Sequence, residues 1–487
     1  MEELYLIAPQ AHQYELSMLL REIKPFCKVY PEKTEGLPGI EILPGGETAR
    51  LVGPNGENLK EVHWPNLSVT YQGSREKNTA KYLILDLLEE ELPWGILTGV
   101  RPAKIAYAYL EEGKAGSEVE ALMQTAYRLR ADKAKLATEV AMAERKLLQD
   151  HSGTDISIYV GIPFCPSRCS YCSFISCDQK AYDKWGEAYI EALLHELKAG
   201  KDFTKDRKLQ SFYMGGGTPT ILDEHRLRLV LEAADKLCDF SNLKEVTVEA
   251  GRPDTITKEK LHVLKELGVT RVSINPQTMR QKTLDAIGRR HSVEQIEAAY
   301  ALAKEQGFSC INMDFIVGLP GETEEDVAYS MEQVMRLRPQ NLTIHTLAIK
   351  RASRIHAEGS SLEYLVGQNA SIARQTDAML TLTAQTAERL GMQPYYMYRQ
   401  KNMAGNFENV GYSLPGLEGL YNVEIMEERQ TILAFGAGSV SKIYDPKINR
   451  LERAANVKDV GEYVRRVDEM IERKKIALQN GGEHGRS

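Results

Sequence analysis

Between residues 155 and 349 the chain alternates short runs of β-forming residues with longer segments of helical periodicity. The longer segments carry apolar residues at three- and four-residue spacing, for example Tyr189, Leu193 and Leu197. This alternation is typical of βα units around a parallel sheet. Six units predict either an open doubly wound sheet or an incomplete barrel related to the (β/α)8 fold, and periodicity alone does not choose between them. The six runs occupy residues 156–161, 211–215, 245–249, 271–275, 311–318 and 342–349.

The regions on either side of this central part have different patterns. Residues 1–150 contain short runs with Pro and Gly followed by helical stretches, which predicts an α+β N-terminal domain. Residues 353–487 contain helical stretches around a Gly-, Asn- and Tyr-rich segment, which predicts a mainly helical C-terminal region. At roughly 150 residues per domain we expect about three parts, with 151–352 as the central one. The expected helices occupy residues 77–92, 103–111, 118–149, 371–390 and 458–475.

Charge and hydropathy exclude several classes of protein. The chain has 61 Lys and Arg against 68 Asp and Glu, a net charge of −7. This balance argues against a broad phosphate-binding surface, and so against nucleic acid as a partner. The first residues do not form a basic segment followed by an apolar one, and nowhere do about 18 uncharged apolar residues follow one another. We therefore expect a cytoplasmic protein without a membrane span.

Three cysteines lie close together directly after the first predicted strand, at Cys165, Cys169 and Cys172. Loops at the carboxyl ends of parallel strands are where such folds build their sites. Three thiolates in one loop can hold three irons of a cubane cluster, while the fourth iron accepts the amino and carboxylate groups of S-adenosylmethionine (SAM). The alternatives are a structural zinc site, with Cys177 as its fourth ligand, or buried structural thiols.

Other residues with chemical potential follow the later strands. Gly215, Gly216 and Gly217 follow the second strand, where absent side chains would let a ligand approach the backbone, although a plain turn explains them equally well. Glu249 ends the third strand and could accept both hydroxyls of a ribose, or be a solvated strand end. Asp314 lies between apolar residues of the fifth strand, so it needs either a ligand or a salt bridge as a partner.

The Cys-x-x-x-Cys-x-x-Cys spacing, with the aromatic Tyr171 before its last cysteine, resembles the signature of the radical SAM superfamily. The resemblance continues over residues 155–350 through Tyr-Met-Gly-Gly-Gly-Thr-Pro-Thr, Val-Glu-Ala, Pro-Gln-Thr-Met, Gly-Arg-Arg-His and Asn-Met-Asp-Phe-Ile-Val-Gly-Leu-Pro-Gly-Glu-Thr. In this order the motifs are similar to those of the oxygen-independent coproporphyrinogen III oxidase family. The N-terminal region and residues 395–412 are most similar to its HemZ-like branch. The resemblance implies a partial (β/α)6 TIM-like barrel of the radical SAM type.

The same resemblance implies which residues hold the cofactors, a [4Fe–4S] cluster and one or two SAM molecules. Cys165, Cys169 and Cys172 would be the metal ligands, and together with Tyr159 they would be the catalytic residues. The residues expected to contact SAM are Tyr159, Tyr171, Gly216, Gly217, Thr218, Glu249, Gln277, Arg289 and Asp314.

The activity that the resemblance implies is the oxidative decarboxylation of two propionates of coproporphyrinogen III to vinyl groups, which gives protoporphyrinogen IX in anaerobic haem biosynthesis. The expected partners are a tetrapyrrole substrate, a reductant such as flavodoxin or ferredoxin, and an electron acceptor that the sequence does not identify. Propionates need cationic partners. The candidates are Arg101, Lys350, Arg351, Arg354, Arg399 and Lys401.

One position departs from the family pattern. The best-known oxygen-independent oxidases carry a cysteine two residues after the third ligand, where this chain has Phe174. Two other functions therefore stay open, a haem chaperone of the same superfamily branch and a radical SAM enzyme for another tetrapyrrole. The chaperones carry a His-Asn-x-x-Tyr-Trp box, whereas this chain has no Trp after Trp185 and no His in residues 395–412.

Overall fold

The computed structural model describes residues 3–24, 27–65, 67, 70–172, 177–205, 207–348, 369–400 and 407–483. The chain packs into two compact units. The first consists of Met1–Lys146, Ser360–Asp377 and Met397–Asn409, and the second of Leu147–Gly359, Ala378–Tyr396 and Val410–Ser487. The three-part division that the sequence suggests, with boundaries at residues 150 and 352, stays a prediction.

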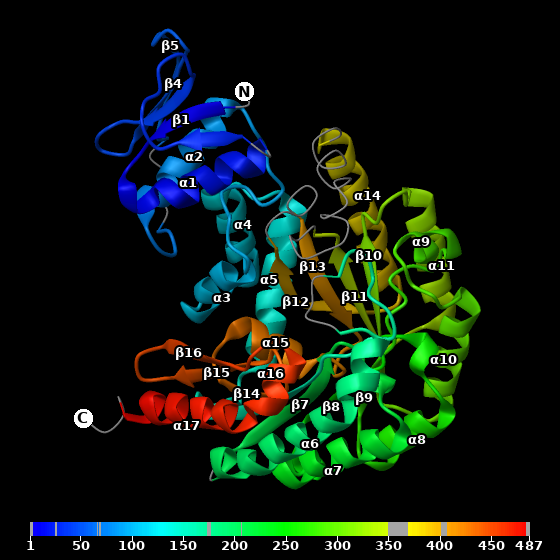
Figure 1. Ribbon diagram of the computed structural model, residues 1–487. Coiled ribbons are helices and arrows are strands. Elements are labelled where there is room, and N and C mark those ends of the chain that lie inside the picture. Colours follow the sequence, from blue (N-terminus) through cyan, green and yellow to red (C-terminus); the bar gives the residue numbers. More distant parts are fainter. Residues whose placement is uncertain are drawn as a thin grey trace. The chain divides into compact units, whose positions relative to one another are not determined.

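The N-terminal part of the first unit has the expected α+β character (Figure 1). Its elements are β1 (Glu3–Ile7), α1 (Gln10–Ile23), β2 (Lys28–Tyr30), β3 (Gly39–Ile42), β4 (Thr48–Val52), β5 (Asn58–His63), α2 (Arg75–Leu88), α3 (Ala103–Glu111), α4 (Gly116–Tyr127) and α5 (Ala131–Leu147). The strands form one sheet in the order β2-β1-β3-β4-β5. The single helical stretch expected at 118–149 is two helices, because Arg128 adopts a left-handed conformation (φ 58°) that ends α4.

All six strands expected in the central part are present. They are β6 (Ile156–Ile162), β7 (Leu209–Gly216), β8 (Glu245–Glu249), β9 (Arg271–Ser273), β10 (Cys310–Val317) and β11 (Asn341–Thr346). Each is parallel to its neighbour, and their order in space repeats their order along the chain. A doubly wound sheet would reverse its order at one point. Because the order from β6 to β11 has no reversal, the strands form the partial barrel that the resemblance implies (Figure 1).

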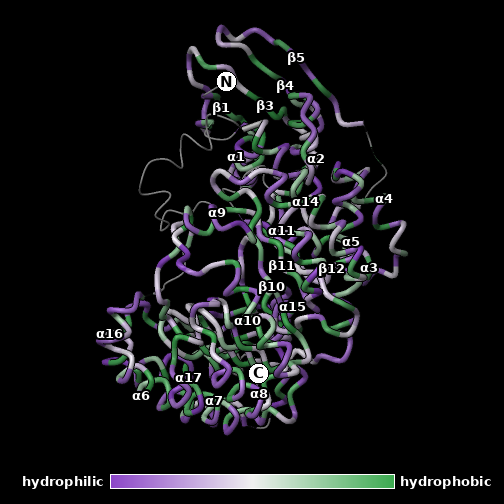
Figure 2. Tube along the Cα trace, turned by 90° about the vertical axis from the view of Figure 1, so that its right-hand side faces the viewer, coloured by the Kyte–Doolittle hydropathy of each residue, from purple (hydrophilic) through white to green (hydrophobic). Residues whose placement is uncertain are grey.

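Helices connect these strands and cover the outside of the sheet (Figure 1). They are α6 (Gln179–Thr204), α7 (Glu224–Cys238), α8 (Lys258–Glu266), α9 (Gln281–Ala286), α10 (Val293–Glu305) and α11 (Glu324–Leu337). Side-chain N-caps start most of them, and Ser292 and Thr323 form complete capping boxes. Each long helix buries one apolar face, and in Figure 2 α6 and α7 accordingly alternate between hydrophilic and hydrophobic colours along their length.

The C-terminal region requires a correction. It contains the helices α14 (Asn369–Arg389), α15 (Leu420–Glu427), α16 (Val460–Arg465) and α17 (Val467–Glu483), but also the strands β12 (Gln393–Arg399), β13 (Glu408–Ser413), β14 (Thr431–Phe435), β15 (Val440–Asp445) and β16 (Arg450–Ala455). β14 runs parallel to β6, and β13 runs antiparallel to β11. The region is therefore mixed rather than mainly helical, because its short β-runs find their partners at the two edges of the central sheet.

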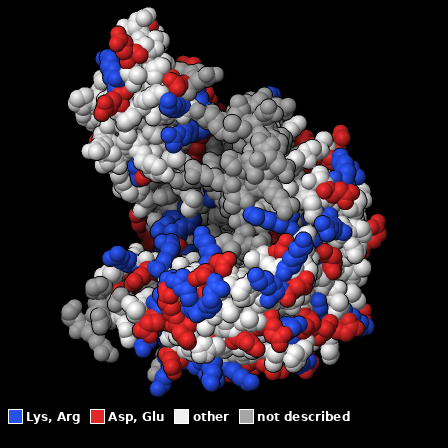
Figure 3. Space-filling model, in the orientation of Figure 1, with Lys and Arg blue, Asp and Glu red and all other residues white. Residues whose placement is uncertain are grey.

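Two features of the structure bear on the expectations drawn from charge and hydropathy. On the face drawn in Figure 3, Lys and Arg are interspersed with Asp and Glu instead of forming one broad basic area. Among the described helices, none is long and apolar enough to cross a membrane.

Candidate active site

The loop that follows β6 carries Cys165, Cys169 and Cys172, and backbone hydrogen bonds fix it at two points. At its start, Cys165 N donates to Cys177 O at 2.8 Å, and Cys177 N donates to Pro163 O at 2.7 Å. In its middle, the amide of Ser170 donates to the carbonyl of Ile287 at 3.0 Å. The described part of the chain thus uses the Cys177 backbone to hold the first cysteine, which is a structural role that the sequence did not show.

One thiol of this loop accepts a hydrogen bond from the turn after β7. Thr218 Oγ1 donates to Cys165 Sγ at 3.4 Å, so at least one sulfur faces a hydrogen-bond donor as cluster ligands do. In the described ranges, no three His, Cys, Asp or Glu side chains converge closely enough to bind one metal ion. The structure thus places the three cysteines in one loop, and their assignment as cluster ligands stays a prediction.

The glycine turn after β7 packs against the start of the cysteine loop. Gly217 N donates to Ile162 O at 2.7 Å, and Thr218 N donates to Phe164 O at 2.8 Å. A Cβ on Gly217 would lie 2.5 Å from Phe164 O, which is closer than the backbone tolerates. Gly216 has φ +102°, a conformation that favours glycine. The turn is therefore needed to bring β7 and the cysteine loop together, whether or not a ligand also approaches it.

Glu249 at the end of β8 lies next to a stack of tyrosine rings. Tyr213 donates to Glu249 Oε1 at 2.6 Å. The Tyr213 ring stacks on Tyr159, with centroids 6.2 Å apart, and on Tyr421 at 4.5 Å. Burial, with a further contribution from the Asp314 charge, raises the pKa of Glu249 to about 7. At neutral pH the carboxyl group is thus poised between its charged and neutral forms, and its second oxygen can take part in binding a polar ligand.

Among the described residues, the ion pair of Asp314 is with His345 and not with an arginine. Its Oδ1 accepts from Asn312 Nδ2 at 2.7 Å, and its Oδ2 lies 3.9 Å from His345 Nε2. The Asp314 side chain retains 18% of its exposure, so it is reachable from the carboxyl end of the barrel. A partly exposed carboxylate with one neutral donor and a distant histidine is suited to accept further hydrogen bonds from a ligand.

Gln277 and Arg289 are buried and both have unused polar atoms. Gln277 has a positive φ of 71°, and its side-chain Oε1 has no hydrogen-bond partner within the described residues. Arg289 donates from Nη1 to the carbonyl of Gly251 at 3.2 Å and from Nη2 to Tyr171 OH at 3.4 Å, while its Nε lacks a partner in the same part of the chain. Strained backbone and unsatisfied buried polar atoms are typical of ligand sites.

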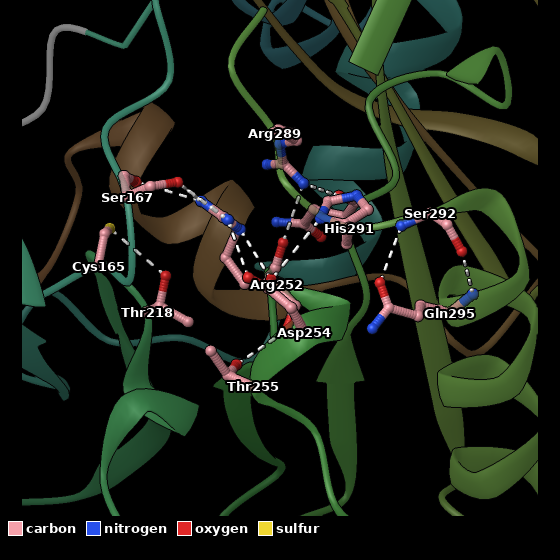
Figure 4. Close-up of polar contacts among 12 residues, drawn as sticks. Cys165, Ser167, Thr218, Arg252, Asp254, Thr255, Arg289, His291, Ser292 and Gln295 are labelled. Atoms are coloured by element: carbon pink, nitrogen blue, oxygen red, sulfur yellow. Dashed lines mark hydrogen bonds and ion pairs between the residues drawn. The ribbon is translucent and has the colours of Figure 1, made fainter. Parts of the chain in front are cut away.

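The structure also brings residues to the site that the sequence analysis missed. Arg252, Asp254 and His291 form a group directly beside the cysteine loop, in which Arg252 and His291 are buried and 21% of the Asp254 side chain is exposed (Figure 4). Arg252 and Asp254 come shortly after the end of β8, and His291 lies two residues after Arg289. Their nearness in sequence to a strand end and to a predicted site residue was the signal that could have identified them.

Of the six cationic candidates for propionate binding, Lys350, Arg351, Arg354 and Lys401 lie outside the described residues. Phe174 also lies outside them. Arg399 is 5% exposed and pairs with Glu22 at 3.1 Å, and it also donates to the carbonyl of Leu97. These contacts give Arg399 a structural role in the first unit, because a buried and paired guanidinium has little left to offer a substrate.

The comparisons with known proteins agree with this fold. Residues 159–334 match the family model of the Radical SAM superfamily, which spans β6 through most of α11. The fold and the cysteine loop thus define a radical SAM protein, a class whose cofactors are a [4Fe–4S] cluster and SAM. The chain is 38% identical over 437 residues to the oxygen-independent coproporphyrinogen-III oxidase-like protein HemZ of Bacillus subtilis (strain 168). The matched region covers 86% of this chain and 85% of that protein. The chain belongs to the HemZ-like family of radical SAM proteins.

Two further relatives mark the range of this group. The heme chaperone HemW of Haemophilus influenzae is 28% identical over 317 residues, covering 63% of this chain and 77% of that protein. The solved structure of coproporphyrinogen III oxidase (HemN) from Escherichia coli, a radical SAM enzyme, superposes with a TM-score of 0.51 at 22% identity, covering 68% of this chain and 73% of that one. This structural likeness confirms the fold.

Proposed function

We propose that this chain is an oxygen-independent coproporphyrinogen III oxidase that converts two propionates of its substrate to vinyl groups. The observation that carries the proposal is the 38% identity to the oxidase-like HemZ protein over 86% of the chain, which includes both flanking regions as well as the barrel. A relative that matched only the barrel would support the chemistry of the superfamily but not a shared substrate.

In this proposal Cys165, Cys169 and Cys172 hold the cluster, and the loop contacts described above keep their thiols at the carboxyl end of β6. When bound, the cluster and SAM together supply one-electron chemistry that removes a hydrogen atom from an unactivated carbon. The remaining task of the protein is to orient the groups and to exclude water.

The proposed SAM contacts come from the carboxyl ends of consecutive strands. Glu249 and Asp314 supply carboxylates for ribose hydroxyls, and Gln277 supplies the amide oxygen that has no partner within the described chain. Arg289 is fixed by Gly251 and Tyr171, and its Nε, which lacks a partner within the described residues, is the proposed donor to a carboxylate. The other proposed contacts are Tyr159, Tyr171, Gly216, Gly217 and Thr218.

The proposed substrate is an acidic tetrapyrrole. Each propionate loses a hydrogen atom from its β-carbon and one electron, its carboxyl group leaves as carbon dioxide, and a vinyl group remains. The electron passes to a separate acceptor, and the cluster receives electrons from a reductant such as flavodoxin or ferredoxin. Arg101 belongs to the first unit, and its role as a partner of a propionate stays a prediction.

The test is an anaerobic assay of the reconstituted chain with reductant, SAM and coproporphyrinogen III, read by mass spectrometry. We expect protoporphyrinogen IX and 5′-deoxyadenosine to form, and both to be lost in Cys169→Ala together with most of the bound iron. Cys238→Ala is the matched control, because Cys238 is a buried cysteine on α7 whose thiol donates a hydrogen bond to the Ala234 carbonyl of the same helix. SAM cleavage without any change in the porphyrinogen would refute the oxidase and direct the search to another tetrapyrrole.

A haem chaperone is the second candidate, since the Haemophilus influenzae HemW protein matches 63% of this chain. Titration with haem, followed by its absorption spectrum, separates the two functions. Stoichiometric haem binding without turnover of coproporphyrinogen III would favour the chaperone. The missing His-Asn-x-x-Tyr-Trp box leads us to expect the opposite result.

A further inference from the structure

Arg252 is a buried arginine outside the expected set of cofactor contacts. It lies shortly after β8, and 4% of its side chain is exposed. Its Nη1 donates to both the carbonyl and the Oγ of Ser167 at 3.1 Å, and it lies 4.0 Å from Cys169 Sγ. Its Nη2 donates to Ser167 Oγ at 3.1 Å. As Figure 4 shows, one guanidinium thus holds the cysteine loop between its first and second cysteines.

Asp254 fixes the other edge of this guanidinium. It accepts from Arg252 Nε and Nη2 with one oxygen each, both at 3.0 Å, which is the two-point geometry that stops a guanidinium from rotating. The turn that carries both residues is tied as well. Thr255 Oγ1 donates to the Arg252 carbonyl at 2.8 Å, and it lies 2.7 Å from Thr220 Oγ1. The protein itself therefore sets the position of Arg252.

His291 is the third member of the group. It is fully buried, and its Nδ1 lies 3.6 Å from Asp254 Oδ1. The two side chains are in contact at this distance, but it is too long for a good hydrogen bond. Burial lowers the pKa of His291, so the ring is neutral at pH 7. A neutral ring adds no charge of its own. The Asp254 carboxylate is thus left to Arg252, and the pair presents its cation toward Cys169.

We propose that Arg252, held by Asp254, is a positioning residue that sets the reduction potential of the cluster on the cysteine loop. The inference rests on the proposed assignment of Cys165, Cys169 and Cys172 as ligands. Reduction adds negative charge to a cluster, and a cation that donates toward a ligating sulfur stabilises the reduced state. Arg252 supplies one such charge at Cys169, in addition to that of Arg289, while Asp254 carries the opposite charge and moderates the effect of Arg252.

The test is an EPR-monitored redox titration of the reconstituted full-length chain, with iron and sulfide counted per chain. Arg252→Gln removes the cation, so at a fixed potential we expect the ratio of reduced to oxidised cluster to fall by at least about tenfold, since one charge within about 12 Å of the added electron contributes that much at an effective dielectric constant of about 20. Asp254→Asn removes the opposing charge and should raise that ratio. Arg252→Lys keeps the charge and should stay near the parent value.

Arg228→Gln is the matched control. Arg228 forms a similar two-point pair with Glu266 on the outer helices, at 3.1 and 2.6 Å, away from the cysteine loop. If Arg252 and Asp254 had a purely structural role, Arg252→Gln and Asp254→Asn would lower the iron content. They would not move the midpoint potential of the cluster in opposite directions. Opposite shifts therefore support the inference, and midpoints that move no more than that of Arg228→Gln overturn it.

Two further results have defined meanings. If Arg252→Gln retains no cluster, the midpoint potential of Asp254→Asn decides between the two roles. A more positive potential than that of the parent chain supports the inference, and an unchanged or more negative one overturns it. A parent chain that binds no iron, or that keeps its iron in Cys169→Ala, overturns the cysteine assignment and with it the inference. If the variants bind a normal cluster but leave its midpoint potential unchanged, the inference is overturned while the cysteine assignment stands.

Discussion

Replacing Lys474 by methionine should destabilise the second unit more than any surface substitution. Lys474 on α17 and Glu196 on α6 are both fully buried, with 2.6 Å between Nζ and Oε1. Lys474 also donates to Asn456 Oδ1 at 2.7 Å. Glu196 further accepts from the Gly436 amide at 2.8 Å and from Tyr463 OH at 2.7 Å. The pair therefore joins α6, α16, α17 and the turn after β14.

The size of the effect follows from the charge that remains. Methionine approximates the volume of the lysine stem, so the cavity contribution is small. The carboxylate of Glu196 would keep its neutral donors but lose its counter-charge, and breaking a buried pair in this way costs about 3–5 kcal/mol in the free energy of unfolding. Adding Glu196→Gln removes the stranded charge, so the double variant should lose less than the sum of the two single variants.

Urea denaturation and hydrogen exchange measured by mass spectrometry would check this. We expect a lower unfolding midpoint and faster exchange in peptides from α17 and from the end of α6. Lys475→Met is the control, since the neighbouring Lys475 side chain is 55% exposed. If Lys474→Met exchanges no faster than Lys475→Met, the buried pair does not hold α17 in place and the reasoning is wrong.

Two other predictions concern the barrel interior. Burial raises the pKa of Glu424 from its ordinary value near 4.5 to about 7, so the unfolded chain releases this proton first and stability should fall as pH rises from about 5 to 7. Glu424→Gln should flatten this part of the curve of unfolding midpoint against pH, and an unchanged slope would contradict the assignment. Gly217→Ala should reduce the iron retained after reconstitution, because its Cβ would lie 2.5 Å from Phe164 O and must push the cysteine loop away. Gly99→Ala, with open space around its Cβ, should retain iron like the parent chain.

The sequence predicted the barrel strands well because each of them is a local pattern. All six runs became strands, and most of their ends shifted by only one or two residues. The partners of a strand are not a local property. The run at β14 reads like any short apolar segment, and only the finished sheet shows that it pairs with β6. The sequence analysis therefore predicted a mainly helical C-terminal region, because helical periodicity is visible in the sequence without any partner strand.

The residues of the candidate site likewise differ in whether a local pattern or a distant contact reveals them. The cysteines could be predicted from their spacing alone, since one loop carries all three. Arg252 could not, because its importance lies in reaching Ser167 and Cys169 across the gap between two strand ends. The glycine turn was predicted as a ligand contact, and the structure adds a packing requirement that depends on how close β6 and β7 approach. A one-dimensional pattern does not contain such distances.

The pairing of β14 with β6 has a consequence for the order of events during translation. Ile156 emerges from the ribosome long before Thr431, its neighbour in the sheet. Until then one edge of β6 has no partner, and exposed edges invite pairing with other chains. Contacts between segments so distant in sequence also form slowly. The strand that leads into the cysteine loop thus keeps an open edge until β14 has been made, so a nascent chain would be most at risk of aggregation at this edge.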